Sequence, residues 1–425
     1  MTSALIADLK WRGAFAQSTD EVELAKHLDS GSRTLYIGFD PTAPSLHLGN
    51  LVQMTMLRRF QLAGHKPIAL VGGATGLVGD PSGRSAERTL NDEEIVAQWL
   101  ERIRKQLEGF LDFKAPKNAA TMANNLDWTA PVSALNFLRD IGKHFSVNQM
   151  LAKDSVSARL ESGGISYTEF SYQVLQAYDF LELFRRANCT LQLGGSDQWG
   201  NITAGLDLIR KVTGESAYAL SVPLLTKSDG EKFGKTVTGS IWLDPAMTSP
   251  YAFYQFFINS DDRDVEKLLK IFSFKSHVEI GELLKSLASN PGAREAHRAL
   301  ARELTTSIHG SDACAKVEVA AKALFGQGEI TDLDSATLAG ALAELPRTTI
   351  NSSSEIPTWV DLIVATGVCE SKSAARRIIK EGGAYLNNKK ITAEDFAPTA
   401  SDLIAGKFLV LRKGKRDLAA VELIK

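Results

Sequence analysis

The sequence is poor in cysteine, and the few cysteines are scattered. Three cysteines, Cys189, Cys314 and Cys369, occur in 425 residues. An odd number at such wide spacing favours neither a disulfide framework nor a zinc site, and it fits a reducing compartment. We therefore expect a cytoplasmic protein without a metal site of its own.

Long apolar runs are also missing. The longest apolar stretches, such as Pro67 to Gly73, are far shorter than the roughly 20 residues that cross a bilayer. The start, Met1-Thr2-Ser3, lacks the basic and then apolar segments of a secretory signal. These absences count against a secreted protein, a membrane protein and a membrane partner.

The chain has no strong net charge, but its charged residues are unevenly distributed along the sequence. The formal net charge is -2, yet residues 371–425 hold 12 Lys and Arg against 6 Asp and Glu, which gives +6 and leaves -8 on the rest. A basic tail on an acidic body suggests a polyanionic partner. At about 100 to 200 residues per domain, the length suggests two to four domains.

The first recognisable pattern is a strand, a helix and a second strand. Residues 34–39 are typical of a buried strand, residues 40–44 of a turn, residues 48–64 of a helix and residues 67–71 of another strand. This order implies a parallel sheet that binds ligands at the loops beyond the strand C-termini. The next loop, residues 72–83, contains five glycines but no dinucleotide-binding fingerprint, so alone it is a weak signal.

The same alternation returns in the middle of the chain. Residues 168–187 predict a long helix, residues 190–193 a strand and residues 198–212 another helix. We therefore expect the parallel sheet to continue through this half.

The rest of the chain predicts separate parts. Beyond Pro250 the pattern is helical to about Phe325, and residues 326–357 are rich in small, polar and turn residues, as a linker would be. We predict an α/β fold with a Rossmann-like parallel-sheet catalytic domain over residues 1–249, an α-helical domain over 250–330, a linker over 331–357 and a small α+β module over 358–425.

The string His47-Leu48-Gly49-Asn50 stands at the mouth of the first predicted helix. A helix N-terminus attracts phosphate, Gly49 lets a flat ring lie against the backbone, and His47 can donate to phosphate oxygens. Taken alone, however, these four residues favour a plain helix start with a surface histidine.

A polar segment from Ser228 to Thr236, which we call the lysine loop, contains Lys232-Phe233-Gly234-Lys235-Thr236. Two lysines on a mobile loop can close over a triphosphate and neutralise charge that grows in the transition state. Alone it would be interpreted as a solvated basic loop. The two motifs together are more specific, because they resemble the bipartite signature of class I aminoacyl-tRNA synthetases.

Three longer strings sharpen this resemblance. They are Gly38-Phe39-Asp40-Pro41-Thr42-Ala43, Gly79-Asp80-Pro81-Ser82-Gly83 and Gly194-Gly195-Ser196-Asp197-Gln198-Trp199-Gly200-Asn201. With their surroundings they resemble the bacterial type of tyrosyl-tRNA synthetase over nearly the whole chain. The resemblance implies an enzyme that activates L-tyrosine with ATP to tyrosyl-adenylate and pyrophosphate, then transfers tyrosine to the 3' end of tRNA(Tyr), giving AMP.

The helix over residues 168–187 gives physical support for a polar pocket. Tyr172, Gln176 and Asp179 are spaced i, i+4 and i+7, which places them on one helical face. Buried polar groups need partners, because an unpaired one costs about 1 to 3 kcal/mol. A satisfied core network or a solvent-facing stripe explains the spacing equally well.

The resemblance assigns roles to individual residues. For tyrosine, it implies that Tyr36 and an ionised Asp179 bind the phenol, that Asp80, Tyr172 and Gln176 hold the ammonium group, and that Gln198 lies near the carboxylate. For ATP, it implies ribose and backbone contacts from Asp40, Gly49, Asn50, Gly195 and Asp197, and γ-phosphate contacts from Thr42 and His47. The mobile cations of the transition state would be Arg84, Arg88, Lys232 and Lys235.

Three residues depart from the common family pattern. Asn50 stands where the signature has histidine, but its amide can donate to a ribose oxygen as an imidazole does. Ile37 stands where cysteine is frequent, so a weak thiol contact to ribose is absent. Arg84 stands where lysine is common, which keeps the charge and changes its geometry.

The C-terminal module has its own resemblance. Residues 371–383 and 384–391 resemble the RNA-binding module named after ribosomal protein S-four, in which a basic helix and a hairpin grip the RNA backbone. The RNA-contacting residues would be Lys372, Arg376, Arg377, Lys380, Lys389 and Lys390. A solvated basic helix is the alternative, and the local positive charge favours RNA.

The resemblance further implies no permanently bound cofactor, magnesium arriving with ATP, and a homodimer formed through the apolar surface of the catalytic half. Since no nucleophile or general base stands out, catalysis would come from positioning and charge stabilisation. Two other classes remain open, a small-molecule nucleotidylyltransferase and a non-catalytic RNA-binding relative. Tyrosine-dependent exchange of pyrophosphate into ATP distinguishes both from a synthetase.

Overall fold

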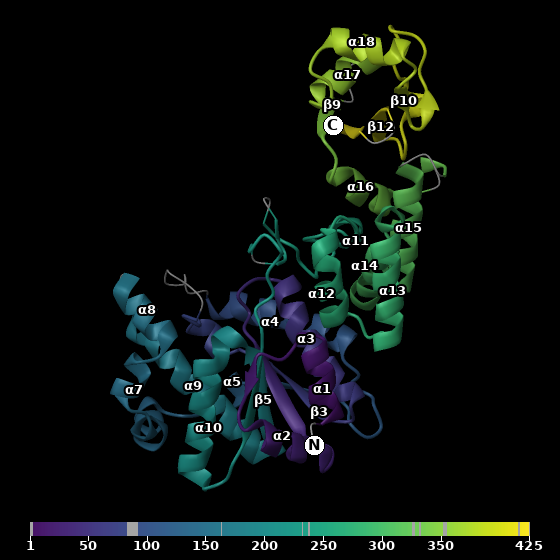
Figure 1. Cartoon of the computed structure of the whole chain (residues 1–425). Coiled ribbons are helices and arrows are strands. Elements are labelled where there is room, and N and C mark those ends of the chain that lie inside the picture. Colours follow the sequence, from purple (N-terminus) through teal and green to yellow (C-terminus); the bar gives the residue numbers. More distant parts are fainter. Residues whose placement is uncertain are drawn as a thin grey trace. The chain divides into compact units, whose positions relative to one another are not determined.

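The structure is a computed structural model, and it describes residues 3–82, 92–162, 164–231, 233–236, 239–324, 328–330, 333–351, 355–414 and 417–424. The side chains of residues 154, 155, 158, 162, 235 and 236 are outside this description. The chain divides into two compact units (Figure 1). The first comprises Met1–Met247 and Ser260–Ala296, and the second comprises Thr248–Asn259 and His297–Lys425.

The first unit is built on a six-stranded sheet in the order β1-β6-β5-β2-β3-β4. Its strands are β1 (Gln17–Ser18), β2 (Thr34–Phe39), β3 (Lys66–Val71), β4 (Thr121–Asn124), β5 (Cys189–Gly195) and β6 (Tyr218–Val222). All neighbours are parallel except β1 and β6. The chain runs from β2 outward to β3 and β4 and then returns to β5, so the order reverses between β2 and β5. Open parallel sheets bind ligands at such a reversal.

Helices surround this sheet (Figure 1). Those of the first unit are α1 (Ala4–Trp11), α2 (Glu21–Asp29), α3 (Leu48–Leu62), α4 (Glu93–Phe110), α5 (Leu126–Thr129), α6 (Ala134–Asn136), α7 (Val147–Leu151), α8 (Asp154–Ser162), α9 (Tyr167–Ala187), α10 (Trp199–Thr213), α12 (Asp262–Phe272) and α13 (His277–Ser289). Local chemistry fixes the ends of α9. The Ser166 side chain accepts a hydrogen bond from the Glu169 N–H, and Asn188 ends the helix in the left-handed conformation.

The elements predicted for this half are confirmed. The strand over 34–39 is β2, the helix over 48–64 is α3 and the strand over 67–71 lies within β3. The helix over 168–187 is α9, and the strand over 190–193 lies within β5. The last predicted helix begins one residue late, at Trp199, because a short 3-10 turn over Ser196–Gln198 precedes α10.

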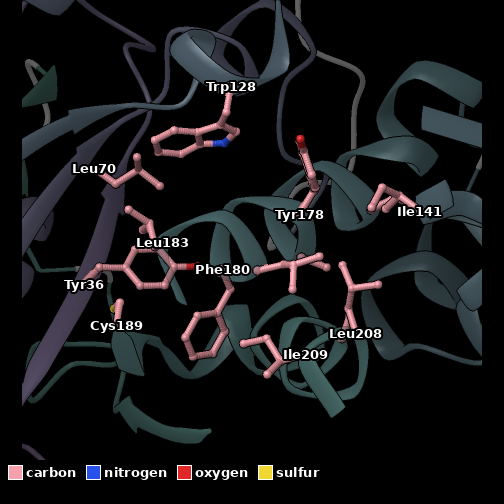
Figure 2. Packing of buried hydrophobic residues seen from close by; sticks show 14 of the residues in the cluster. Tyr36, Leu70, Trp128, Ile141, Tyr178, Phe180, Leu183, Cys189, Leu208 and Ile209 are labelled. Atoms are coloured by element: carbon pink, nitrogen blue, oxygen red, sulfur yellow. The ribbon is translucent and has the colours of Figure 1, made fainter. Parts of the chain in front are cut away.

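Helices α9 and α10 pack on the sheet around one apolar cluster (Figure 2). The rings of Tyr36 from β2 and Phe180 from α9 are 5.3 Å apart between centroids. Leu208 and Ile209 of α10 belong to the same cluster. This packing brings the polar tip of Tyr36 into an otherwise apolar interior, where a hydroxyl needs a partner.

The second unit is helical and then forms a smaller sheet. Its helices are α11 (Pro250–Ile258), α14 (Glu295–His309, whose first residues belong to the first unit), α15 (Ser311–Leu324), α16 (Ser335–Ala343), α17 (Trp359–Ala365) and α18 (Lys372–Lys380). The sheet has the order β11-β10-β12-β13-β9, with β9 (Arg347–Asn351), β10 (Ala384–Leu386), β11 (Lys389–Lys390), β12 (Phe408–Lys413) and β13 (Asp417–Ile424). Trp359, Leu409 and Val421 are buried in the core of the module.

Two predicted boundaries need correction. The helical part from residue 250 is divided, because α12 and α13 lie in the first unit. The residues predicted as a linker, 331–357, contain α16 and β9, and β9 pairs in parallel with β13. Small residues led to the linker prediction, but they also suit close helix packing, and Asp334 caps α16 by accepting from the Thr337 N–H. Among the described helices, none is both long and apolar enough to cross a bilayer.

Candidate active site

The predicted site residues of the first unit gather at the carboxyl ends of β2, β3 and β5. Asp40 follows β2 directly, Asp80 lies in the loop after β3, and Gln198 lies in the turn after β5. Tyr36 of β2 is paired in register with Gln192 of β5. These residues therefore lie beside the reversal of strand order between β2 and β5, where open parallel sheets bind ligands.

Tyr36, Asn125, Trp128 and Asp179 form what we call the Asp179 cluster. Asp179 is 2% exposed, and its two carboxylate oxygens accept from Trp128 Nε1 at 2.8 Å and from Asn125 Nδ2 at 2.9 Å. Tyr36 is 1% exposed, and its buried hydroxyl has no hydrogen-bond partner among the described residues. A buried hydroxyl beside a carboxylate is suited to bind a second hydroxyl.

Burial controls the protonation of this cluster. Burial raises the pKa of Asp179 to about 7, although the hydrogen bonds from Asn125 and Trp128 lower it. Burial also raises the pKa of Tyr36 well above its usual value, and the charge of Asp179 adds to this rise. Tyr36 is therefore a neutral donor. Asp179 was expected to be ionised, and a pKa of about 7 makes the charged form dominant only above neutral pH.

A chain of hydrogen bonds leads from the Asp179 cluster to the loop after β2. Asn125 Nδ2 donates to Thr75 Oγ1 at 2.9 Å, and Thr75 Oγ1 donates to Asp40 Oδ1 at 2.6 Å. The Tyr172 hydroxyl donates to the other oxygen of Asp40 at 2.7 Å. In this chain of hydrogen bonds, both carboxylates accept from neutral donors.

The part of the pocket predicted for the ammonium group is rich in carboxylates. Burial raises the pKa of Tyr172 well above its usual value, and the charges of Asp40, Asp80 and Asp179 raise it further. Gln198 Nε2 donates to Asp80 Oδ2 at 2.6 Å, and the Gln176 Oε1 atom is buried without a hydrogen-bond partner among the described residues. Such a concentration of negative charge favours a cationic ligand group.

His47 and Asn50 form the N-terminal cap of α3. His47 Nδ1 accepts from the N–H groups of Gly49 and Asn50 at 3.0 and 3.4 Å, and Asn50 Oδ1 accepts from the His47 N–H at 3.1 Å. Since Nδ1 accepts, the proton of the neutral ring is on Nε2, the nitrogen that could donate to phosphate. A Cβ atom on Gly49 would lie 2.8 Å from His47 Cε1, so a larger residue here would displace the His47 ring.

The His47 motif and the lysine loop are in direct contact. The Leu48 N–H donates to Ile241 O at 3.0 Å, and the Ile241 N–H donates to Gly234 O at 2.9 Å. Gly234 has a φ of +80°, and a Cβ atom there would lie 2.8 Å from Leu48 Cβ. Only glycine fits both the left-handed backbone and this close approach. The structure therefore brings together the two motifs that the sequence analysis paired.

Several predicted residues have less structural detail. Thr42 is exposed, and its N–H donates to Asp40 O at 2.9 Å. Gly195 ends β5, and a side chain there would collide with Asp197. The predicted cations Arg84, Arg88 and Lys232 lie outside the described residues, and Lys235 is described only by its backbone in the short strand β7 (Lys235–Thr236).

Sequence reasoning missed Asn125, Trp128 and Thr75, which hold Asp179 and Asp40. None of them stands in a recognised string. Trp128 and Asn125 each carry a signal that could have been used. The N–H group of a buried tryptophan needs an acceptor, and Asn125 comes directly after the end of a strand, where site residues gather. The missing step was to recognise β4, whose four residues carry little apolar pattern.

The predicted RNA-contacting residues all lie on the surface of the C-terminal module. Lys372, Arg376, Arg377 and Lys380 are exposed on α18, and Lys389 and Lys390 are exposed on β11. Four acidic contacts lie nearby: Lys372 is 2.6 Å from Asp361, Lys380 and Arg376 are 3.2 and 3.6 Å from Glu394, and Arg377 is 3.9 Å from Glu381. Exposed ion pairs are weak, so phosphates can replace these carboxylates.

Comparison with known proteins places the chain in a family. The family described as tRNA synthetases class I (W and Y) matches residues 29–326, and the tyrosine–tRNA ligase SYY-like C-terminal domain matches residues 337–421. The chain is 61% identical over 420 residues to a tyrosine–tRNA ligase of Streptomyces avermitilis, and 60% identical over 420 residues to that of Streptomyces griseus. Each match covers 98% of both chains.

Solved structures agree. A C-terminally truncated mitochondrial tyrosyl-tRNA synthetase of Aspergillus nidulans superimposes with a TM-score of 0.68 at 31% identity, covering 76% of this chain and 94% of that one. The tyrosyl-tRNA synthetase of Archaeoglobus fulgidus, solved with L-tyrosine, shares the fold with a TM-score of 0.55 at 16% identity, over 73% and 99% of the two chains. The family matches and the relatives that align over nearly the whole chain show that it belongs to the tyrosine–tRNA ligase family of class I tRNA synthetases.

Proposed function

We propose that the chain joins tyrosine to tRNA(Tyr) at this site in two steps. A tyrosine carboxylate oxygen attacks the α-phosphorus of ATP, the bond to pyrophosphate breaks, and tyrosyl-adenylate forms. A ribose hydroxyl at the 3' end of the tRNA then attacks the tyrosyl carbonyl, and AMP leaves. The observation that carries this proposal is the Asp179 cluster, in which an unpaired buried donor, Tyr36, stands beside a carboxylate already held by two other donors.

The site residues take the following roles in this proposal. Tyr36 and Asp179 bind the phenol, Asp80, Tyr172 and Gln176 bind the ammonium group, and Gln198 lies near the carboxylate. Asp40, Gly49, Asn50, Gly195 and Asp197 contact the nucleoside, and Thr42 and His47 contact the phosphates. Arg84, Arg88, Lys232 and Lys235 neutralise the departing pyrophosphate.

The chemistry needs no covalent enzyme intermediate. The carboxylate-rich pocket holds the ammonium group, so the tyrosine carboxylate is oriented while it remains a free nucleophile. The His47 Nε2–H and the lysine loop then stabilise charge on the phosphates, which is greatest in the transition state. Magnesium would accompany the ATP phosphates. Among the described residues, no group of three or more His, Cys, Asp or Glu side chains is arranged to hold a metal ion.

Tyrosine-dependent exchange of labelled pyrophosphate into ATP tests the first step. We expect exchange with tyrosine and negligible exchange with tryptophan or phenylalanine. Exchange with tryptophan at a comparable rate would contradict the assignment of the Asp179 cluster. Charging of tRNA(Tyr) tests the second step, and a small-molecule nucleotidylyltransferase or a non-catalytic RNA-binding relative would fail it.

We assign tRNA binding to the basic face of the C-terminal module, for which the exposed lysines and arginines of α18 and β11 are the support. A chain ending at Leu345 should still form tyrosyl-adenylate but charge tRNA poorly. This end point precedes β9, which belongs to the module sheet. In the full chain, Arg377→Ala with Lys389→Ala should weaken tRNA binding and reduce its salt dependence, whereas Lys26→Ala, an exposed lysine of α2, should not.

We further propose that the enzyme acts in the cytoplasm as a homodimer. Residues 126–167 hold seven of the fifteen large apolar side chains that are exposed among the described residues. They are Leu126, Leu135, Leu138, Val147, Leu151, Leu160 and Tyr167. Such a concentration marks an interaction surface. Leu135, 80% exposed, is its most exposed member, so Leu135→Glu should give monomers in sedimentation at micromolar concentration. Val278→Glu, at an exposed site on α13, should leave the dimer intact.

A further inference from the structure

Among its described residues, the lysine loop contacts the rest of the first unit through its backbone and through Phe233. In the second half of the loop, the Phe233 N–H donates to Leu225 O, which precedes the loop, at 3.1 Å and closes a hairpin-like stem. At its first residue, the Ser228 N–H donates to Asp264 Oδ1 at 2.8 Å. Asp264 belongs to α12 and stands in none of the strings that identified the family.

The environment of Asp264 is unusual for a residue in the first turn of a helix. The capping of α12 is already done by Asp261, whose side chain accepts from the Arg263 N–H at 2.9 Å. Asp264 is therefore not needed as a cap, and yet it is only 8% exposed. Burying a carboxylate is costly unless a donor compensates it. The donor that the structure provides is the Ser228 N–H of the lysine loop.

Two further contacts tie the same helix to the same loop. Lys267 Nζ donates to Thr226 O at 2.8 Å, just before the loop begins. The rings of Phe233 and Phe272 are 5.9 Å apart, and Phe272 is fully buried. The start of α12 therefore holds the first residue of the loop, and its end packs against the middle of the loop.

Helix α12 is itself fixed to the helix that carries the His47 motif. Arg59 of α3 donates to Ile271 O at 2.9 Å and to Ser273 O at 2.6 Å, and Arg12, the residue after α1, donates to Ser273 O at 3.0 Å. At the other end of α3, Leu48 meets Gly234 of the lysine loop. The lysine loop, α12 and α3 thus each contact the other two. The hydrogen bond from the Ser228 N–H to Asp264 is part of the contact between the loop and α12.

We propose that Asp264 is a positioning residue for adenylate formation, which acts by holding the stem of the lysine loop so that its lysines reach the departing pyrophosphate. The inference rests on the role of the lysine loop in the proposed function. Asp264 touches neither tyrosine nor ATP in this proposal, so its loss lowers the rate and leaves substrate binding in place.

Pyrophosphate exchange with the full-length chain gives the first test. Asp264→Ala should lower kcat about tenfold, with the KM for tyrosine and its equilibrium binding changed less than about twofold. Asp264→Asn retains an acceptor oxygen and should recover most of the rate. The matched control is Glu266→Gln on the same helix, where an exposed glutamate pairs with Lys270 at 2.7 Å, and it should behave as wild type.

Limited trypsin digestion gives a second readout that does not depend on catalysis. Cleavage after Lys227 and Lys232, followed by mass spectrometry, should be faster in Asp264→Ala than in wild type or Glu266→Gln, because the loop stem has lost its tie. Cleavage elsewhere should be unchanged if the variant is folded.

These results separate this inference from the proposed function. If Lys235→Ala leaves the exchange rate unchanged, the lysine loop has no catalytic role, and the digestion result still reports whether Asp264 holds the loop. If Asp264→Ala changes neither the rate nor the cleavage, the positioning role is wrong. A loss of tyrosine affinity equal to the loss of rate would likewise overturn it, because it would reveal general damage to the site.

Discussion

The Asp179 cluster and the lysine loop are built in opposite ways. In the Asp179 cluster, buried side chains hold one another, and the carboxylate has both oxygens occupied before any ligand arrives. The lysine loop is held at its backbone and at Phe233, while flanking side chains such as Glu231 are exposed. A group that selects a substrate benefits from rigid partners, whereas a group that acts on charge formed in the transition state must be able to move.

Of the substitutions that test this comparison, Asp179→Ala should have the largest effect on activity. It removes a charged acceptor and leaves the Asn125 and Trp128 donors buried and unpaired, a loss of about 3 to 5 kcal/mol. In pyrophosphate exchange, kcat/KM for tyrosine should fall by a factor of about a hundred to several thousand. The control Asp207→Ala, at an exposed site on α10, should be silent. A decrease below about fivefold would show that Asp179 does not bind the phenol.

Lys235→Ala tests the lysine loop, the second region of the comparison. Because we propose that this cation acts on charge that develops in the transition state, kcat should fall about a hundredfold while tyrosine binding is unchanged. Single-turnover adenylate formation and equilibrium dialysis of tyrosine measure the two quantities. Lys227→Ala, which removes a lysine already paired with Glu231 at 2.8 Å, is the matched control. Equal losses of rate and affinity would contradict the role.

The protonation of Asp179 should make tyrosine binding depend on pH. Burial raises its pKa to about 7, so the charged carboxylate, which we propose accepts a hydrogen bond from the phenol, is present above that pH and is lost as the pH falls through it. If binding requires the charged form, the Kd for tyrosine at pH 6 should be about tenfold higher than at pH 8. Calorimetric titration across this range measures it. The Asp179→Asn variant should show no such trend, and a flat profile in the wild type would refute the assignment.

Tyr36→Phe should give the smallest effect. It removes one neutral hydrogen bond, worth about 0.5 to 1.5 kcal/mol, so discrimination between tyrosine and phenylalanine should fall roughly two- to tenfold. The ratio of kcat/KM for the two amino acids reports this change. The free enzyme should be no less stable, because the lost hydroxyl has no partner among the described residues. An unchanged ratio would mean that Tyr36 does not contact the substrate hydroxyl.

Much of the fold follows from the sequence, because its signals are local. Strand β2 is an apolar run that ends in a turn, and α9 has both a helical apolar period and a serine cap. The pairing of the His47 motif with the lysine loop was also predictable, but only through resemblance. No local property of residue 48 indicates that Gly234 packs against it.

The support around the site could not be predicted in the same way. Asn125, directly after β4, and Trp128 of α5 reach Asp179 from more than 50 residues earlier in the chain, and only the sheet order brings them together. Asp264 is similar, since its partner is a backbone N–H that carries no sequence signature. The predicted linker failed for the opposite reason. Its composition was a true local signal, but pairing with the distant β13 decided the structure of β9.

One series of hydrogen bonds limits how this enzyme can be re-engineered for unnatural amino acids. It runs from Trp128 through Asp179, Asn125 and Thr75 to Asp40. Asn125 and Trp128 both donate to Asp179. A neutral residue at position 179 therefore leaves these two N–H groups without an acceptor unless the new side chain accepts from both. A successful redesign would need to recode Asn125 and Trp128 together with Asp179. Libraries that randomise only the residues touching the ligand would therefore contain mostly sequences whose pocket has buried N–H donors without acceptors.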